Sequence, residues 1–454
     1  MKSPFPFDAV VAFGFLSILL LVGVALRAKV TMLQRFLFPS CLIGGIIGLI
    51  SIYILPLGLE ASRLETMAYH FFNISFISVG LTRENDNGGQ PTKSRTVLRG
   101  AAWMALIQGL TFPLQAALGG LLVLLLGLFG LDLFPTFGFL APLGFNEGPG
   151  QALSFGKVWE TLGFAHGATI GLTFAALGFG FAFFVGVPLV NYGLRKGLSS
   201  SGPKEIPRDF LVGIMPRQGN REPAGALTLH SGNVETLAYQ AALVGLVYLL
   251  TYFIVKFLSG LLPGDAGSML WGFCFFFGLA VSLLVKRLMK AFGVDYLADP
   301  GVQRRITGWS VDFLIVATIT AIQLKVVWAY LFPILLISLT VGVLTTLLVV
   351  FFGRRLDAYP LERTAAIYGV VTGTVSTGLL LLRIADPEFK TPAAFEVALM
   401  NVFALPIVGG CTVLVNGPLW WHWSVGLTVV VFAGVFLASL IVLRLLGFWK
   451  LTRP

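Results

Sequence analysis

Apolar runs of about 20 residues recur from one end of this 454-residue chain to the other. A helix of that length crosses the roughly 30 Å hydrocarbon core of a lipid bilayer. Only 11% of the residues are charged and 56% are hydrophobic, whereas soluble proteins are about 25% charged. A soluble fold of this composition would expose large apolar patches. The sequence therefore predicts an all-α polytopic membrane protein in a lipid bilayer, and it excludes a soluble enzyme, a nucleic-acid binder and a disordered chain.

We predict about eleven transmembrane helices, at 8–26, 36–55, 66–82, 100–129, 168–194, 236–258, 267–285, 309–325, 326–352, 393–415 and 419–447. With the N-terminus outside, nearly all of the 31 Lys and Arg residues fall on the inner side, the exceptions being Lys2, Arg63, Lys157, Lys256 and Lys325. The positive-inside rule describes this asymmetry. It predicts an outer N-terminus and a cytoplasmic C-terminus, and it accounts for the net charge of +10 without nucleic acid as a partner.

A polar stretch at 195–235 divides the chain into halves with the same order of segments. Each half has two spans, a short polar-dotted span, a long span, a broken segment with a Gly-rich centre, and a closing span. Five spans per half is an odd number, so the second half enters the membrane upside down. We therefore expect inverted five-helix repeats at 1–194 and 236–416, a cytoplasmic linker between them, and an extra C-terminal transmembrane helix in 417–454.

The broken segments, 137–160 and 364–388, each have apolar arms on both sides of a polar knot. An arm of roughly ten helical residues covers about 15 Å, which is half of the hydrocarbon core. Each segment is therefore expected to be a re-entrant hairpin whose tip lies near the midplane. Irregular backbone at this depth is tolerated where it lines a protein-walled or watery cavity. Two ordinary interfacial loops are the alternative, but matching positions in the two halves favour a functional site.

The two tips supply candidate ligands for an ion and a small-molecule substrate. Unwound carbonyls and hydroxyls suit Na⁺, half-helix N-termini suit a carboxylate, and glycine permits close approach of the backbone. The predicted binding residues are Asn146, Glu147, Gly148, Gly150 and Gln151 in the first tip, Thr372, Gly373, Thr374, Ser376, Thr377 and Gly378 in the second, and Asn73, Ser75 and Asn401 in neighbouring spans. The predicted Na⁺ ligands among them are Glu147, Thr374, Ser376 and Thr377.

Glu147 is an acid inside the membrane, and such a residue is a functional hypothesis by default. It would repel an anionic substrate unless a cation lies between them. It could instead ligate Na⁺, carry a proton or meet the ammonium group of a substrate. The structural alternative is an ion pair with a nearby cation such as Lys157.

Other polar residues within the spans are expected to have structural roles. Two acids near the inner interface could touch a cation path, but pairing with Arg304, Arg305 or Lys390 is favoured for both Asp312 and Glu396. Three glutamines are expected to make packing contacts, namely Gln108, Gln115 and Gln240. The four histidines are scattered, which predicts no metal site for them.

Two phrases of the sequence resemble a known family, Phe36–Gly45 after the first span and Phe76–Thr82 in the third. With the two Gly-rich hairpins and the run Phe179–Tyr192, they are similar over roughly 30–416 to the bacterial sodium/glutamate symporters. The related 2-hydroxycarboxylate transporters share this plan. The resemblance lies more in layout than in residues, and the residues of both tips and the extra final span depart from the family.

The resemblance implies a secondary transporter of the inner membrane that works by elevator-like alternating access. It implies a mobile domain that carries the hairpins and the third span, and a static domain that forms a homodimer. We therefore predict a sodium-coupled symporter of glutamate or a related small amino or carboxylic acid, with no cofactor besides Na⁺. The alternatives are a proton-coupled or exchange transporter of another small organic acid or amine, and a channel. An enzyme is not expected, because the sequence has no H-E-x-x-H, G-x-S-x-G or P-loop motif.

Overall fold

The computed structural model describes residues 7–54, 58–82, 95–200, 208–216, 223–262, 266–387 and 390–449, and their regular structure is entirely helical. Eight helices in these ranges are long and apolar enough to cross a membrane, so the protein is a multi-pass membrane protein. Each of the eight overlaps a predicted span: Asp8–Lys29, Arg95–Leu128, Gly167–Arg195, Thr236–Leu261, Gly267–Ala291, Leu331–Gly353, Ala393–Leu414 and Val425–Leu445. The all-α class is thereby confirmed for the described residues.

The other three predicted spans are helices that fall short of these criteria for two physical reasons. Helix α3 (Ser40–Ile54) has 15 residues, which is short for a bilayer core of roughly 30 Å. Helices α4 (Ala61–Leu81) and α14 (Pro300–Thr320) are longer but carry charged residues, including Glu65 and Asp312. These two helices pack along each other, so much of their surface faces protein rather than lipid. Eleven spans therefore stays a prediction.

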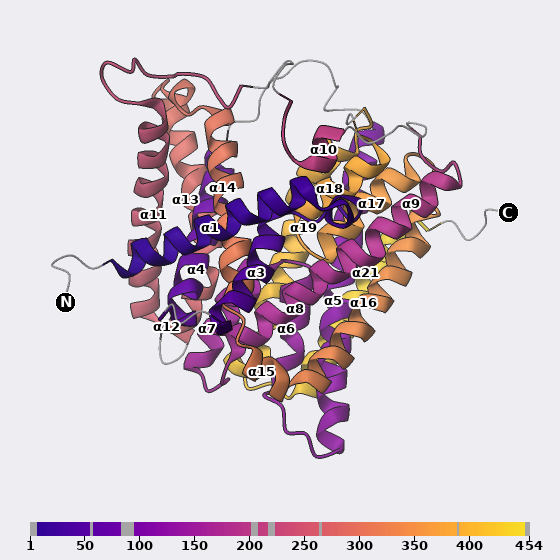
Figure 1. Ribbon diagram of the computed structural model, residues 1–454. Helices are drawn as coiled ribbons and strands as arrows, with labels where there is room; N and C mark the ends of the chain where they lie inside the picture. The colour runs from indigo at the N-terminus through magenta and orange to yellow at the C-terminus, as the bar shows by residue number, and fades with distance from the viewer. Residues whose placement is uncertain are drawn as a thin grey trace.

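One group of helices, which we call the α4 bundle, is built around the α4–α14 pair. Its other members are α1 (Asp8–Lys29), α3, α11 (Thr236–Leu261) and α13 (Cys274–Ala291). Helix α3 packs on α14 while α13 packs on α4, and α1 packs on α3 while α11 packs on α13. Helices α11, α13 and α14 stand side by side on the left of Figure 1.

A second group, the α5 bundle, surrounds the long helix α5 (Arg95–Leu128). Helices α16 (Leu331–Gly353), α19 (Ala393–Leu414) and α21 (Val425–Leu445) pack directly on α5. Helix α8 (Gly167–Phe181) continues through the π-turn Ala182–Gly186 into α9 (Val187–Arg195). Most of this bundle lies on the right of Figure 1, although α7 (Pro149–Thr161) of the first broken segment lies at the lower left beside α12 (Ala266–Met269), and the bundle contains both predicted broken segments.

Short helical elements connect the long helices. They are α2 (Thr31–Arg35), α10 (Arg208–Val212), α12 (Ala266–Met269), η3 (Leu270–Phe273), η4 (Asp295–Leu297), α15 (Leu324–Ala329) and α20 (Gly417–Trp420). Helix α10 belongs to the predicted linker, and the carbonyl oxygen of Phe210 accepts a hydrogen bond from Nη2 of Arg27 at 3.0 Å. Lys2, residue 388 and parts of 195–235 and 417–454 lie outside the described residues. The predicted domain boundaries remain predictions.

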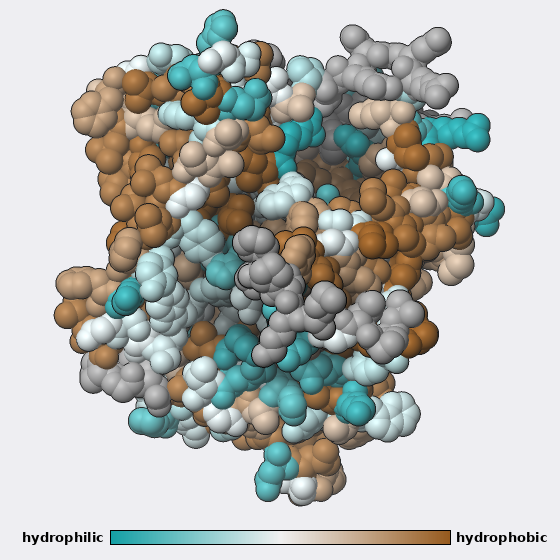
Figure 2. Space-filling model, turned by 60° about the vertical axis from the view of Figure 1, so that its left-hand side comes forward, coloured by the Kyte–Doolittle hydropathy of each residue, from teal (hydrophilic) through white to brown (hydrophobic). Residues whose placement is uncertain are grey.

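Large apolar side chains lie both in the core and on the surface. Trp103, Trp159 and Tyr368 are fully buried, whereas Leu128 on α5 is 82% exposed. The face drawn in Figure 2 has broad brown areas at its upper left and on its right, and paler and hydrophilic residues run through its middle and lower part. Continuous apolar surface of this extent requires lipid or another protein chain in contact with it. This surface agrees with the membrane location that helix length and hydropathy indicate.

Candidate functional site

The first broken helix consists of α6 (Leu140–Phe145), which follows the turn η1 (Phe137–Phe139), and α7 (Pro149–Thr161). The helix stops at Asn146 and restarts after Gly148, whose φ of +87° is unfavourable for any residue with a Cβ. Pro149 then occupies the first turn of α7, where its missing N–H has no helical partner to lose. The break thus follows from local sequence, at the predicted position.

The second broken helix consists of α17 (Pro360–Val371) and α18 (Val375–Ala385). It begins at Pro360, earlier than the predicted 364. Thr374 caps α18, because its hydroxyl accepts a hydrogen bond from the backbone N–H of Thr377 at 3.4 Å. The hydroxyls of Thr374 and Thr377 lie 3.2 Å apart. Ser376, by contrast, is exposed.

The tips of the two broken helices touch. A Cβ placed on residue 148 would lie 2.8 Å from the methyl carbon of Thr374 and 3.0 Å from the carbonyl oxygen of Gly373. Gly148 therefore lets the first tip approach the second more closely than any other residue could. The structure brings together these predicted residues from segments more than 200 positions apart in the chain.

Helix α5 contacts both tips through three polar residues on one face. Gln108 Nε2 donates to Glu147 Oε1 at 3.4 Å, and Asn146 Nδ2 donates to Thr111 Oγ1 at 2.9 Å. Gln115 Nε2 donates to the carbonyl oxygen of Val371, at the end of α17, at 3.2 Å. The packing roles predicted for Gln108 and Gln115 did not include these contacts with the tips. Their spacing with Thr111, at i, i+3 and i+7, was the signal that could have shown a shared polar face.

Glu147 keeps part of its side chain accessible, although Asn146 and Gly148 on either side are buried. Its second carboxylate oxygen, Oε2, accepts a hydrogen bond from Gln151 Nε2 at 2.8 Å. The ion pairs among the described residues do not include Glu147. Lys157, its alternative partner, contacts Glu65 of α4 at 2.7 Å and Glu160 at 2.9 Å instead.

Amide oxygens are the unusual feature of this region. Each of four buried amides donates through its nitrogen, while its oxygen has no hydrogen-bond partner among the described residues: Gln108, Gln115, Asn146 and Gln151. Buried polar atoms are rarely left without a partner, because losing water costs free energy that a hydrogen bond normally offsets. Four free acceptors beside the two tips therefore mark a region that can receive a ligand with positive charge or donor groups.

Three predicted residues lie outside the tips. On α4, Asn73 donates to the carbonyl oxygen of Tyr69 at 2.8 Å, and Ser75 donates to that of Phe72 at 2.7 Å. The ring of Phe72 occupies the space that a Cβ on residue 150 would fill, so α4 covers the first tip. Asn401 is exposed on α19 and donates to the carbonyl oxygen of Val397 at 3.3 Å.

The far ends of the broken helices are held by different ion pairs. Arg363 of α17 donates to both carboxylate oxygens of Glu396 on α19, at 2.8 and 2.5 Å, and their side chains are 4% and 0% exposed. Among the described residues, Glu396 thus pairs with Arg363, and not with Arg304, Arg305 or Lys390, which were its predicted partners. On α7, the side chain of Lys157 is 51% exposed, and its partner Glu65 is 4% exposed. The first pair lies within the α5 bundle, and the second joins the two bundles.

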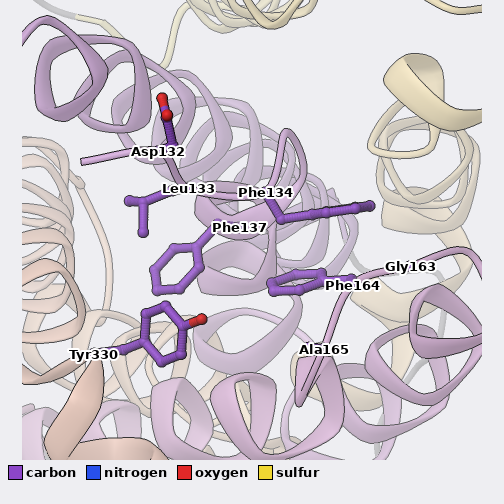
Figure 3. Close-up of a pocket in the computed structure, with 8 residues that line it drawn as sticks. All are labelled: Asp132, Leu133, Phe134, Phe137, Gly163, Phe164, Ala165 and Tyr330. Atoms are coloured by element: carbon purple, nitrogen blue, oxygen red, sulfur yellow. The ribbon is translucent and has the colours of Figure 1, made fainter. Parts of the chain in front are cut away.

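A pocket of about 300 Å³ lies at the predicted outer end of the first broken helix. Its walls come from Asp132, Leu133, Phe134, Phe137, Gly163, Phe164, Ala165 and Tyr330, and no predicted site residue is among them. In Figure 3, Phe134 stacks on Phe164, with ring centroids 4.6 Å apart, and Phe137 faces Tyr330. The residues that line this pocket do not belong to either tip, so the pocket is separate from the region around Glu147.

Comparison with known proteins finds no family model that matches this chain and no curated protein that is significantly similar to it. The likeness to sodium/glutamate symporters thus rests on the order of segments and the short phrases quoted above. The binding roles of the tip residues stay predictions, which the geometry now makes specific.

Proposed function

We propose that the protein is a secondary transporter whose substrate and coupling ion bind where the two broken helices meet. The main observation behind this proposal is the contact of Gly148 with Gly373 and Thr374, beside the partly exposed side chain of Glu147. Helix ends inside a membrane protein are stable where neighbouring groups or a ligand satisfy the free backbone atoms. Discontinuous helices of this kind commonly form the ion and substrate sites of transporters.

Packing within the bundles supports an inverted repeat. In the α4 bundle, α3 on α14 corresponds to α13 on α4, and α1 on α14 corresponds to α11 on α4. In the α5 bundle, α19 on α5 corresponds to α8 on α16, and α17 on α5 corresponds to α6 on α16. An exchange of partners like this is the pattern expected of two halves related by a two-fold axis. Both broken segments are then re-entrant hairpins that enter from opposite sides.

Alternating access would come from movement of the α5 bundle against the α4 bundle. The α5 bundle carries both tips, and α7 meets α4 through Phe72 and through the ion pair of Lys157 with Glu65. In this scheme α4 belongs to the facing bundle, unlike the third span of the family plan. The α4 bundle would then be the static part and the homodimer interface, in an inner membrane with the N-terminus outside.

Na⁺ is proposed as the coupling ion, with ligands from Glu147, Thr374, Ser376 and Thr377. Glutamate or a related small amino or carboxylic acid is the proposed substrate. Glu147 has no cation partner among the described residues, and this observation also favours the second candidate, in which the carboxylate carries a proton and the transporter is proton-coupled. A channel is the third reading, and it would not concentrate its substrate.

Uptake into proteoliposomes tests the proposal. Purified protein would be reconstituted, and accumulation of labelled L-glutamate measured with an inward Na⁺ gradient, an inward proton gradient, or a matched K⁺ control. Accumulation above the external concentration with either gradient supports secondary transport and names the ion. Entry that only equilibrates across the membrane indicates a channel. Folded protein that takes up no glutamate with any gradient would reject glutamate as the substrate.

A further inference from the structure

The surroundings of Glu147 are rich in hydrogen-bond acceptors. The carboxylate of Glu147 accepts hydrogen bonds from residues on two different helices, Gln108 on α5 at 3.4 Å and Gln151 on α7 at 2.8 Å. These two bonds fix the orientation of the carboxylate without neutralising it. A carboxylate withdrawn from water needs an opposite charge, because hydrogen bonds from neutral amides replace only part of its hydration.

The same amides that orient Glu147 also leave oxygens free. The side-chain oxygens of Gln108, Asn146 and Gln151 have no hydrogen-bond partner among the described residues, and these residues are 6%, 2% and 4% exposed. Asn146 is the immediate neighbour of Glu147, and its nitrogen is already used by Thr111. Three neutral amide oxygens and one carboxylate thus lie around the first tip. The nitrogens of the same three amides already donate to other residues.

An anionic ligand would find only acceptors and like charge at these atoms. A cationic group would find a counter-charge and neutral oxygens, which are the ligands that hard metal cations prefer. An ammonium group can likewise donate up to three N–H bonds to such oxygens. The chemistry is the same for a metal ion and for the ammonium group of a substrate.

We propose that Glu147, with the oxygens of Gln108, Asn146 and Gln151, forms a binding site for one monovalent cationic group. This inference deepens the proposed transport function and rests on it, because it assigns positive charge to the first tip. A carboxylate of the substrate then binds away from Glu147, on the side of the second tip. The inference excludes a substrate whose only charged groups are anionic, unless a metal cation occupies this site first.

The test measures chemical protection of Glu147 in the full-length protein. Dicyclohexylcarbodiimide modifies carboxyl groups in apolar surroundings, and mass spectrometry gives the modified fraction of each acid. The reaction would be followed in equal concentrations of NaCl, methylammonium chloride and N-methylglucamine chloride, whose much larger cation serves as the control. At a cation concentration about ten times its Kd, mass action slows the labelling of Glu147 about ten-fold.

The three salts separate the two sources of charge. Protection by Na⁺ alone identifies a metal site, and protection by methylammonium alone identifies a site for the amine of a substrate. Equal labelling in all three salts overturns the proposal. Labelling of Glu396, which is already paired with Arg363, provides the internal control because it should not depend on the cation.

Variants and a second readout complete the test. Gln108→Leu and Gln151→Leu should lose the protection while Glu147 remains reactive, whereas Gln323→Leu, at the start of α15, should keep it. If Glu147 does not react in any salt, the thermal midpoint decides. A rise in NaCl or methylammonium that Glu147→Gln abolishes supports the site, and the same midpoint in all three salts overturns it. Ion-driven uptake without protection rejects this inference alone, and protection without uptake rejects only the proposed transport.

Discussion

The two broken helices differ in what holds their arms. In the first, α6 and α7 both pack along α8, which lies against the two of them. In the second, α17 and α18 pack mainly on each other, and a Cβ on Gly369 would lie 2.7 Å from the Cα of Gly378. The first broken helix is therefore held in shape by the neighbouring helix α8. The second is held in shape by contacts between its own two arms. Segments with the same order in the sequence have thus acquired different supports.

The two tips also differ in their chemistry. The first presents the carboxylate of Glu147 and free amide oxygens, whereas the second presents the hydroxyls of Thr374, Ser376 and Thr377. At the start of α18, the backbone N–H of Thr377 donates to the hydroxyl of Thr374. The tips are therefore not interchangeable: the first suits positive charge, and the second offers neutral groups that can donate or accept hydrogen bonds.

The largest expected effect comes from breaking the buried ion pair between Arg363 and Glu396, at the end of the second broken helix that lies away from its tip. Arg363→Met leaves Glu396 buried without a counter-charge, which should lower the free energy of unfolding by about 3–5 kcal/mol. Denaturation of the purified protein in detergent measures this loss. The double variant Arg363→Met/Glu396→Leu should recover much of it, because no unpaired charge remains. A single variant as stable as the wild type would show that the pair does not hold α17.

The next largest effect tests the contact between the tips. Gly148→Ala forces a residue with a Cβ to adopt a φ of +87° and places that Cβ 2.8 Å from Thr374. Backbone strain alone costs about 1–2 kcal/mol, and the clash adds displacement of the tips, so uptake should fall about ten-fold or more.

Gly163→Ala is the matched control for this variant. Its φ is +96°, and an added Cβ would meet no atom within 4 Å, so it carries the strain without the clash. Uptake should then stay within about two-fold of the wild type. Equal losses of uptake in the two variants would mean that the contact between the tips is unimportant.

A smaller effect on stability is expected from the ion pair of Lys157 on α7, which lies away from the tip of the first broken helix. Lys157 is half-exposed, so water can partly solvate the carboxylate of Glu65 that Lys157→Met leaves unpaired. The free energy of unfolding should fall by about 1–3 kcal/mol, which is below the effect of Arg363→Met. Because Lys157 joins α7 to Glu65 of the other bundle, the rate of uptake should respond more than stability does. Lys157→Arg should keep both values near those of the wild type. A stability loss as large as that of Arg363→Met would mean that the two ion pairs, Lys157 with Glu65 and Arg363 with Glu396, stabilise the fold equally.

The smallest effect is predicted at the second tip. Ser376→Ala removes one exposed hydroxyl, and the loss of a single weak ligand bond of about 0.5 kcal/mol should raise the Na⁺ concentration for half-maximal uptake about two- to three-fold. The thermal midpoint should not change. Val375→Ala, at the exposed position before it, serves as the control. An unchanged Na⁺ dependence in Ser376→Ala would argue against this hydroxyl as a ligand.

Local sequence was sufficient to predict the long spans and both breaks. Hydropathy locates a helix that faces lipid, and Gly148 followed by Pro149 marks an interruption wherever it occurs. Helices α4 and α14 are weak in hydropathy because they shield each other from lipid, and no local pattern reveals such a partner. The sequence therefore indicated their polar character without its cause.

The partners of individual side chains were much harder to predict. Lys157 and Glu65 are separated by 92 positions in the chain, so their contact follows only from the way the bundles pack. Gln108 and Gln115 resembled packing residues because their partners lie in the two tips, far along the sequence. Asn401 was chosen for its depth in a span, but the exposed face it occupies depends on the neighbours of α19.

The close contact of Gly369 with Gly378 has a mechanical consequence. Most neighbouring helices are separated by a layer of side chains that can change rotamer and absorb a small displacement. Where Gly369 of α17 meets Gly378 of α18 this layer is missing, because backbone meets backbone. A displacement of α17 at its Pro360 end should therefore be transmitted to Thr374, at the start of α18, with little change in the packing between the two helices. Force applied at one end of this pair is felt at the site on the other.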